Sequence, residues 1–332
     1  MADYFYSSAR VRALEKNLLD KDALLRILDA STLDSAYLML EEHGYTLKTD
    51  SNGKILREET LLTRLSAAYY EIAQLTQELE GDLFSIWRYP YDCNNLKAVI
   101  KCFIRGVSCE GMTFDFGTLS VEEIQKMVRT QDYLALPARM SRAAVEAMAA
   151  YSKTKDPQRI DLMLDCACYA DMLDGAEKSG VTYAAKLVRT KIDLINLVMC
   201  LRVMRMESGD TGKILLSDAL LDGGTLAKDR ILDFYELEEK SFWEALLYSD
   251  YCRFAQAVSS KQPSLTEVER AADNVFMDVV REARFIACGA EVLIGYLLGT
   301  ENEVRNIRVL LAGKSTGLPR EIVWERIRES YV

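Results

Sequence analysis

Apolar residues recur at three- and four-residue intervals along almost the whole chain, which is the spacing of an amphipathic helix. In residues 9–27, Val11, Leu14, Leu18 and Leu25 follow this spacing. The same pattern predicts helices over residues 66–83, 140–151, 160–173, 183–205, 229–258, 268–299 (with a break) and 303–312. Residues 45–56 are the one candidate for strands, because Asn52-Gly53 suits a hairpin turn, and a plain loop is the alternative. The pattern therefore predicts an all-α fold.

Two short signatures alternate along this helical pattern. The first is an acid, two residues, asparagine and an aliphatic residue, and it occurs at Asp92/Asn95, Asp193/Asn196 and Glu303/Asn306. The second is leucine, two residues, an acid, one residue and an aliphatic residue, and its leucines are Leu19, Leu119, Leu226 and Leu318. Both recur with a period near 100 residues, which is too long for a solenoid repeat. We interpret the chain as three similar helical modules, residues 1–111, 112–220 and 221–332, packed as one compact unit.

The extra leucine signature near the N-terminus would let the two ends of the chain supply equivalent elements. That arrangement suits three modules closing around a pseudo-threefold axis. Within the first signature, the acid and the asparagine lie on one face of a helix, because three residues separate them. The pair either caps a helix start or bonds the backbone of a neighbouring helix, or it makes a polar contact with a partner three times.

Composition narrows the class of protein further. The chain has 332 residues, only 17 glycines and 5 prolines, and a formal net charge of −10. So few chain-breaking residues argue against an all-β fold, and Ser120 with Glu123 and Ser264 with Glu267 have the spacing of capping boxes at helix starts. The negative charge argues against nucleic acid and anionic lipid as partners. No apolar run reaches the length of a membrane span, and we expect no signal peptide.

A search for chemistry finds no enzyme signature. The eight cysteines form no Cys-x-x-Cys pair, and we expect free thiols packed as small apolar residues. The single histidine, His43, suits a helix C-terminus, and one histidine cannot build a di-metal carboxylate site. Gly313-Lys314-Ser315 resembles the end of a phosphate loop, but Arg308 stands where that loop needs glycine, so Gly313 is expected to cap a helix. We therefore expect no catalytic residue, cofactor or metal.

The order of several segments carries a family resemblance. They are residues 6–15 (Tyr-Ser-Ser-Ala-Arg-Val-Arg-Ala-Leu-Glu), 28–45 ending in His43-Gly44-Tyr45, 91–97, and the tail from Glu303 through Gly313-Lys314 to Gly317-Leu318-Pro319. Taken together, the chain resembles the C subunit of prokaryotic V-type and A-type ATPases, whose eukaryotic counterpart is the d subunit. The resemblance spans essentially the whole chain. Residues 207–224 depart from it as an unusually long, glycine-bearing link.

This resemblance implies a funnel-shaped, non-catalytic coupling subunit on the cytoplasmic face of the membrane. Such a protein sits on the proteolipid rotor ring and acts as a socket for the central shaft, which is built from the D and F subunits. It thereby couples ATP hydrolysis or synthesis to transport of H⁺ or Na⁺. The alternatives are a helical scaffold or adaptor unrelated to a rotary ATPase, and an enzyme with an unrecognised site. We expect the isolated protein to be a monomer, held at the membrane through protein contacts alone.

Overall fold

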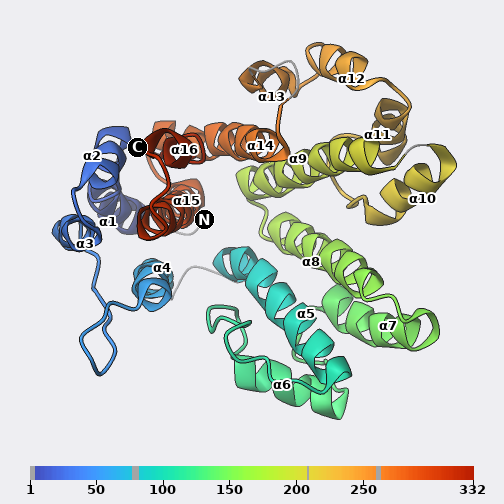
Figure 1. Ribbon diagram of the computed structural model, residues 1–332, viewed down its shortest axis with the longest axis horizontal. Coiled ribbons are helices and arrows are strands. Elements are labelled where there is room, and N and C mark those ends of the chain that lie inside the picture. Colours follow the sequence, from blue (N-terminus) through green and yellow to red (C-terminus); the bar gives the residue numbers. More distant parts are fainter. Residues whose placement is uncertain (1–3, 77–81, 208, 259–262) are drawn as a thin grey trace. The chain divides into compact units, whose positions relative to one another are not determined.

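Helices account for nearly all regular structure in the computed structural model of the chain, which describes residues 4–76, 82–207, 209–258 and 263–332. These residues form sixteen α-helices and two short 3-10 helices, and they contain no strand (Figure 1). Residues 45–56 make a tight turn with a single isolated bridge between Thr49 and Ile55. The predicted all-α fold is therefore confirmed, and the loop alternative holds for this segment.

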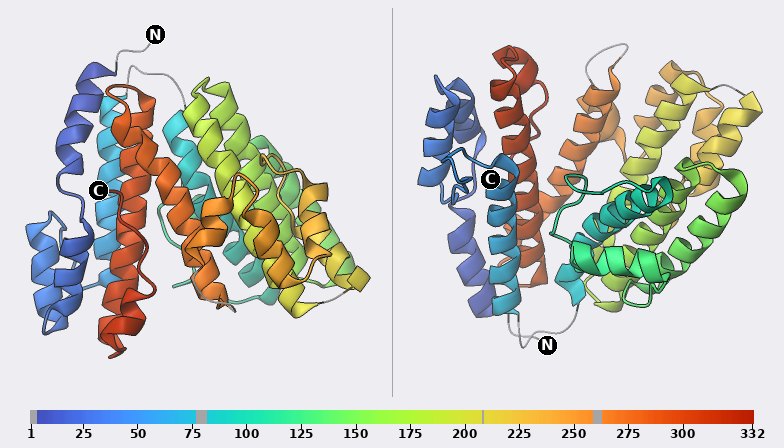
Figure 2. Two further views of the ribbon diagram at one scale, coloured as in Figure 1. Left: turned by 90° about the horizontal axis from the view of Figure 1, so that it is seen from above. Right: turned by 60° about the horizontal axis from the view of Figure 1, so that its bottom comes forward.

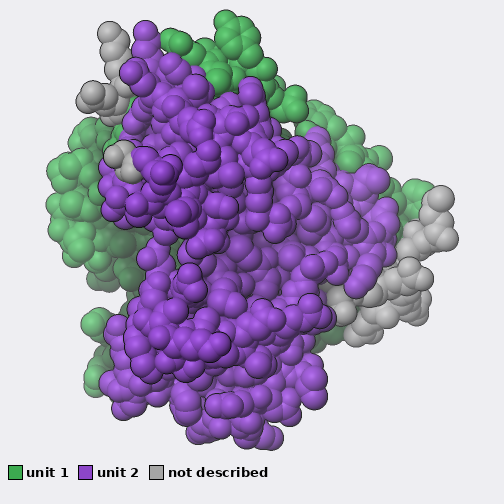
Figure 3. All heavy atoms as spheres, turned by 90° about the vertical axis from the view of Figure 1, so that its right-hand side faces the viewer, with its two compact units in different colours: residues 1–80, 244–332 green, residues 81–243 purple. Residues whose placement is uncertain are grey.

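The chain divides into two compact units, which Figure 3 colours separately. Unit 2 comprises residues 81–243, and unit 1 comprises the flanking residues 1–80 and 244–332. Unit 1 contains α1 (Phe5–Glu15), α2 (Lys21–Asp29), α3 (Leu33–Glu42), α4 (Arg57–Leu75), α13 (Cys252–Ala257), α14 (Leu265–Val280), η2 (Arg281–Phe285), α15 (Ala290–Ser315) and α16 (Arg320–Trp324). Unit 2 contains η1 (Asp82–Arg88), α5 (Tyr89–Arg105), α6 (Val121–Thr130), α7 (Ala138–Thr154), α8 (Gln158–Lys178), α9 (Thr182–Met206), α10 (Gly209–Ala219) and α11 (Lys228–Tyr235). The border falls inside α12 (Glu239–Leu246).

The core of unit 1 is built around α15. Most of its residues are buried on every side, which is typical of a central helix rather than an amphipathic surface one. Helices α1 and α4 run alongside it, as Figure 2 shows. Tyr331 packs against Gly295 and Gly299, where an added Cβ would come within 2.8 Å and 2.7 Å of the tyrosine hydroxyl or ring. These glycines let the C-terminal segment lie directly on α15.

The core of unit 2 is formed by α8 and α9. Helix α8 packs against α5, α7 and α9, and α9 also packs against α10 and α11. Two ion pairs join α5 to α8, one between Lys97 and Asp165 at 2.7 Å and one between Lys101 and Asp161 at 2.5 Å. The result is a layered bundle in which the long α9 is covered along much of its length.

Several predicted helix boundaries are wrong. Residues 9–27 are two helices rather than one, because Asp20 caps α2 by accepting a 2.7 Å hydrogen bond from Ala23 N. Residues 229–258 divide into α11, α12 and α13, and the supposed link 207–224 contains α10. Residues 303–312 lie inside α15 and do not open a helix, and Gly313 also lies inside it rather than at its cap. Part of the predicted helix 66–83, residues 77–81, lies outside the described residues.

Other boundaries agree with the sequence. Ser120 and Glu123 form a reciprocal capping box at the start of α6, and Ser264 caps α14. His43 is the C-terminal cap of α3, as its setting predicts. The predicted break in residues 268–299 is present, because α14 ends at Val280 and α15 begins at Ala290.

Candidate functional site

The three acid–asparagine pairs lie on three long helices. Asp92 and Asn95 occupy the first turns of α5, whereas the second pair lies inside α9 and the third inside α15. All six side chains are buried, with at most 5% of any of them exposed. A buried polar group must find a hydrogen-bond partner, so each pair needs one within the fold. We call each pair, together with the main chain it holds, the first, second and third clamp.

The first clamp holds the segment between α5 and α6. Asp92 accepts hydrogen bonds from the main-chain N–H groups of Thr118 (3.0 Å) and Leu119 (3.1 Å), and from the Thr118 hydroxyl (2.6 Å). Asn95 donates to the carbonyl of Phe114 at 2.7 Å and accepts from its N–H at 3.0 Å. Two side chains thus fix two points of one loop against the helix.

The second clamp repeats these bonds in the segment between α10 and α11. Asp193 accepts from the N–H groups of Thr225 (2.8 Å) and Leu226 (3.1 Å), and from the Thr225 hydroxyl. Asn196 donates to the carbonyl of Leu221 at 3.0 Å and accepts from its N–H at 2.8 Å. In both clamps, the leucine of the second signature is one of the two residues whose N–H reaches the acid.

The third clamp gathers segments from opposite ends of the sequence. Glu303 accepts a 2.5 Å hydrogen bond from the N–H of Leu19, which lies between α1 and α2. Asn306 donates to the carbonyl of Arg328 at 3.0 Å and accepts from its N–H at 2.9 Å. As in the other clamps, the acid accepts from the N–H of a signature leucine, and the asparagine bonds to the N–H and carbonyl of one residue. Here, however, the two bonded segments are far apart in sequence.

Further polar groups surround Glu303. The hydroxyl of Tyr45 donates to its carboxylate at 2.7 Å, and Arg64 Nε lies 3.5 Å from Oε1. Burial raises the pKa of Glu303, while Arg64 and these hydrogen bonds oppose that rise by favouring the carboxylate. Burial likewise raises the pKa of Asp92, and the bonds from Thr118 oppose it. These carboxylates are therefore held in place by the same groups that favour their ionised form.

The fourth leucine signature takes no part in a clamp. The N–H of Leu318 donates to the carbonyl of Gly313 at 3.0 Å, and its side chain is 39% exposed. The other three signature leucines each meet an acid of the first signature. These contacts cross the predicted module borders, since Asp92 holds Leu119 and Asp193 holds Leu226.

The glycine and threonine of the first two clamps are not among the residues that the sequence patterns single out. A Cβ on Gly117 would lie 1.9 Å from Asp92 Oδ1, and one on Gly224 would lie 2.0 Å from Asp193 Oδ1. Only glycine allows the carboxylate to approach the chain this closely. The signal is a Gly-Thr-Leu tripeptide that occurs at residues 117–119 and 224–226. In the third clamp, the Tyr45 hydroxyl takes the place of the threonine hydroxyl.

The three clamps fix the main chain of non-helical segments to α5, α9 and α15. The polar atoms of the six signature residues face backbone groups inside the fold, so we interpret them as structural joints rather than partner contacts. Across the described part of the chain, no three His, Cys, Asp or Glu side chains are grouped so that they could hold a metal ion, and the eight cysteines are free thiols. Within those same ranges, no helix combines the length and the apolar character that a bilayer crossing requires.

Comparison with known proteins supports one family. The family model described as ATP synthase (C/AC39) subunit matches residues 7–326. The C subunit of the V-type sodium ATPase of Enterococcus hirae is 23% identical over 99% of both chains. The C subunit of the A-type ATP synthase of Methanococcoides burtonii is 23% identical over 97% of this chain and 93% of its own. That of Thermococcus kodakarensis is 23% identical over 98% and 90%. The chain therefore belongs to the ATP synthase (C/AC39) subunit family, whose members are structural rather than catalytic parts of the V/A-type ATP synthase.

Proposed function

We propose that this chain is the central-stalk coupling subunit of a V/A-type rotary ATPase. It forms a socket between the shaft of D and F subunits and the proteolipid ring, on the cytoplasmic face of the membrane. Rotation of the shaft then reaches the ring through it, and ATP hydrolysis or synthesis is coupled to transport of H⁺ or Na⁺. The observation that carries the proposal is the family match over residues 7–326, together with relatives aligned over nearly their full length.

The clamps support a role in transmitting torque. A coupling part must not yield when one end turns against the other, and loops are the elements of a helical bundle that yield most easily. Each clamp fixes such a segment to a long helix, because its buried acid accepts hydrogen bonds from the segment and its buried asparagine both donates and accepts. Helix α15, with 26 residues, is about 39 Å long at 1.5 Å per residue. It is clamped near its middle, at Glu303 and Asn306.

We also propose that the chain consists of three related modules, residues 1–111, 112–220 and 221–332, with a pseudo-threefold arrangement and a funnel shape. The three clamps support a common origin, because each contains an acid that holds the N–H of a signature leucine and an asparagine that holds a main-chain amide pair. In this view, each clamp connects one module to the next. The third clamp would connect the last module back to the first through Leu19.

A depletion and add-back experiment tests the coupling role. Membranes from a strain without this protein should release a headpiece that still hydrolyses ATP, while ATP-driven ion uptake into membrane vesicles is lost. Adding the purified chain together with the headpiece and the D and F subunits should restore uptake, and adding the same mixture without the chain should not. Ion pumping that persists in its absence would contradict the proposal.

The alternative of a helical scaffold unrelated to the rotor makes a different prediction. The tagged chain, purified from detergent-solubilised native membranes, should bring the D and F subunits and the proteolipid with it if it is the socket. Recovery of other proteins without these subunits, across a range of salt concentrations, would favour the scaffold.

A further inference from the structure

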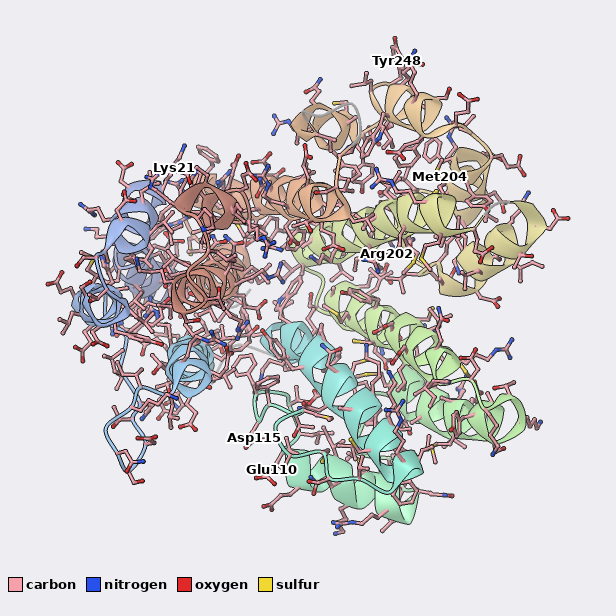
Figure 4. The ribbon with its side chains drawn as sticks, viewed as in Figure 1. Lys21, Glu110, Asp115, Arg202, Met204 and Tyr248 are labelled. Atoms are coloured by element: carbon pink, nitrogen blue, oxygen red, sulfur yellow. The ribbon has the colours of Figure 1, made fainter. Side chains whose placement is uncertain are left out.

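An open pocket of about 520 Å³ lies in unit 2, and none of its lining residues belongs to a clamp. It forms where α9 and α11 end and where α10 and α12 begin, and Figure 1 shows α9, α10 and α11 packed together. Met204, labelled in Figure 4, contributes its side chain from the last turn of α9.

The pocket wall is held in place by internal bonds. Tyr235 donates its hydroxyl to the carbonyl of Glu207, at 3.0 Å, and also lies 3.2 Å from the carbonyl of Gly209. Gly212 packs so closely on this tyrosine that a Cβ would lie 2.0 Å from its hydroxyl oxygen. Because the wall is fixed before anything binds, little ordering would be needed to fill the pocket.

The pocket is strongly acidic. Five of its lining residues are acids and one is a lysine, Lys213. That lysine is paired with Glu236, and Arg205 beside the pocket is paired with Glu239 through a 3.0 Å bond from Nε. The remaining acids are Glu207, Asp210 and Glu238. The C-terminal ends of α9 and α11 and the N-terminal ends of α10 and α12 meet here, so their helix dipoles largely offset each other and the carboxylates supply the negative charge. Such a surface attracts cationic groups.

Exposed apolar side chains lie on the segments that form the pocket. Met206 is 68% exposed, Ile214 is 64% exposed and Leu237 is 38% exposed. Leu237 lines the pocket, and the other two are chain neighbours of the lining residues Glu207 and Lys213. Single exposed apolar residues are common, but three on the segments that form one hollow are typical of a surface that binds protein.

We propose that this acidic pocket docks a basic segment of a protein partner. A lysine or arginine side chain of that segment enters the pocket, and apolar residues beside it cover Met206, Ile214 and Leu237. The same carboxylates would repel nucleic acid and anionic lipid, which need basic surfaces. The pocket is partly open to solvent and its lining includes the exposed Leu237, which suits a protein segment better than a small cation. The proposal does not depend on the rotor role.

A peptide titration tests the chemistry on the whole isolated chain. The probe is a fluorescent helical peptide with leucines on one face and lysines beside them, and its control has glutamate in place of every lysine. The double variant Asp210→Asn, Glu238→Gln removes two negative charges from the pocket. Among the described residues, neither carboxylate forms an ion pair. Glu41→Gln with Glu42→Gln removes two exposed charges from α3 in unit 1. Fluorescence anisotropy at physiological ionic strength gives the dissociation constants.

We expect the lysine peptide to bind the pocket variant about tenfold more weakly than the unaltered chain, as two weakened charge pairs allow. The α3 variant should bind within about twofold of the unaltered chain. Equal weakening by both variants, or equal binding of the glutamate peptide, would show a general charge effect and overturn the proposal. Circular dichroism of both variants verifies that they fold.

Cross-linking in the assembled ATPase identifies the natural occupant. A photo-reactive amino acid in place of Ile214, in the complex purified from native membranes, should form a cross-link to a protein segment that contains lysine or arginine. The same residue in place of Leu38, an exposed leucine of unit 1, is the control. Cross-links only to lipid, nucleic acid or a second copy of this chain, or no cross-link beyond the control, would refute the docking site. If the docking site is refuted but ATP-driven ion uptake still requires this chain, the proposed coupling function is unaffected.

Discussion

The second and third clamps both contain an acid that accepts from a leucine N–H and an asparagine that pairs with one residue's amide, but the groups around the acid differ. In the second clamp, a short aspartate reaches the N–H groups of Thr225 and Leu226 because glycine precedes them. In the third, a longer glutamate reaches Leu19 from the other end of the chain, and Tyr45 and Arg64 complete its shell. No glycine is needed there, since the extra methylene group of glutamate supplies the reach.

This comparison shows which features all three clamps share and which features vary among them. An acid that accepts from a leucine N–H, and an asparagine that pairs with one residue's amide, are present in all three. The hydroxyl donor and the spacing along the chain vary. The third clamp also contains a buried ion pair, and removing one member of such a pair leaves the other charge unpaired. Damage to it should therefore cost more than damage to the other two.

The largest effect is expected for Glu303→Ala. It leaves the Leu19 N–H and the Tyr45 hydroxyl without their acceptor and Arg64 without its counter-charge. We expect the free energy of unfolding of unit 1 to fall by about 3–5 kcal/mol. Hydrogen exchange measured by mass spectrometry should show the Leu19 amide losing its protection. Glu325→Ala, an exposed acid near the same end of the chain, should leave exchange unchanged. Equal protection in both variants would contradict the assigned role of Glu303.

The asparagines allow a comparison inside unit 2. Asn196 pairs with Leu221, which is 4% exposed, whereas Asn95 pairs with Phe114, which is 45% exposed. Asn196→Ala leaves a buried N–H and carbonyl unsatisfied and should cost about 3 kcal/mol, while water can replace part of what Asn95→Ala removes, for about 1 kcal/mol. Urea unfolding followed by circular dichroism measures both. A larger loss for Asn95→Ala would show that burial does not set the cost.

Much of this picture follows from the sequence, for a physical reason. Helical periodicity predicts the all-α class because each helix must bury one face, and the acid–asparagine spacing places both side chains on the same face. The partners of these pairs are harder to predict. Asn95 and Asn196 bond to the main chain of residues that carry no pattern of their own, because every residue offers the same N–H and carbonyl. A sequence cannot distinguish Phe114 from its neighbours on that basis.

Helix boundaries fail where tertiary bonds outweigh local pattern. Residues 16–20 continue the apolar spacing of α1, yet the chain leaves the helix there, Asp20 caps α2, and Leu19 donates to Glu303. Helix α10 is missed for the opposite reason, since glycines at 209 and 212 resemble a link. Gly212 is instead required by the close approach of Tyr235. The Gly-Thr-Leu tripeptide is visible in the sequence, but its meaning depends on the carboxylate that it meets.

A smaller effect should result from Gly117→Ala. The new methyl group would overlap Asp92 Oδ1, so the carboxylate must move and weaken its bonds to Thr118 and Leu119. We expect a loss of about 2 kcal/mol in the free energy of unfolding. A double-mutant cycle with Asp92→Ala tests the cause, because the glycine substitution should cost much less once the carboxylate is gone. Additive losses would mean that Gly117 is needed for another reason.

The smallest effect concerns pH and again compares two regions. Burial raises the pKa of Glu303 above its usual 4.5, so the folded chain keeps this proton to a higher pH than the unfolded chain does. Its contribution to stability is therefore complete below pH 4.5 and is lost as the pH rises through the folded-state pKa. Glu303→Gln removes the pH dependence that this carboxyl contributes. The difference in unfolding free energy, unaltered chain minus variant, should therefore fall as the pH is raised from about 4.5 to about 7.

Glu123, in the exposed capping box of α6, should behave in the opposite way. Hydrogen bonds from the N–H and hydroxyl of Ser120 lower the pKa of its carboxyl, so its contribution is present above the usual value and is lost as the pH falls. The corresponding difference for Glu123→Gln should rise with pH. Urea unfolding of the three proteins at matched pH values measures both slopes. If the Glu303 difference also rises with pH, attraction to Arg64 outweighs burial, and the third clamp is stabilised chiefly by its ion pair.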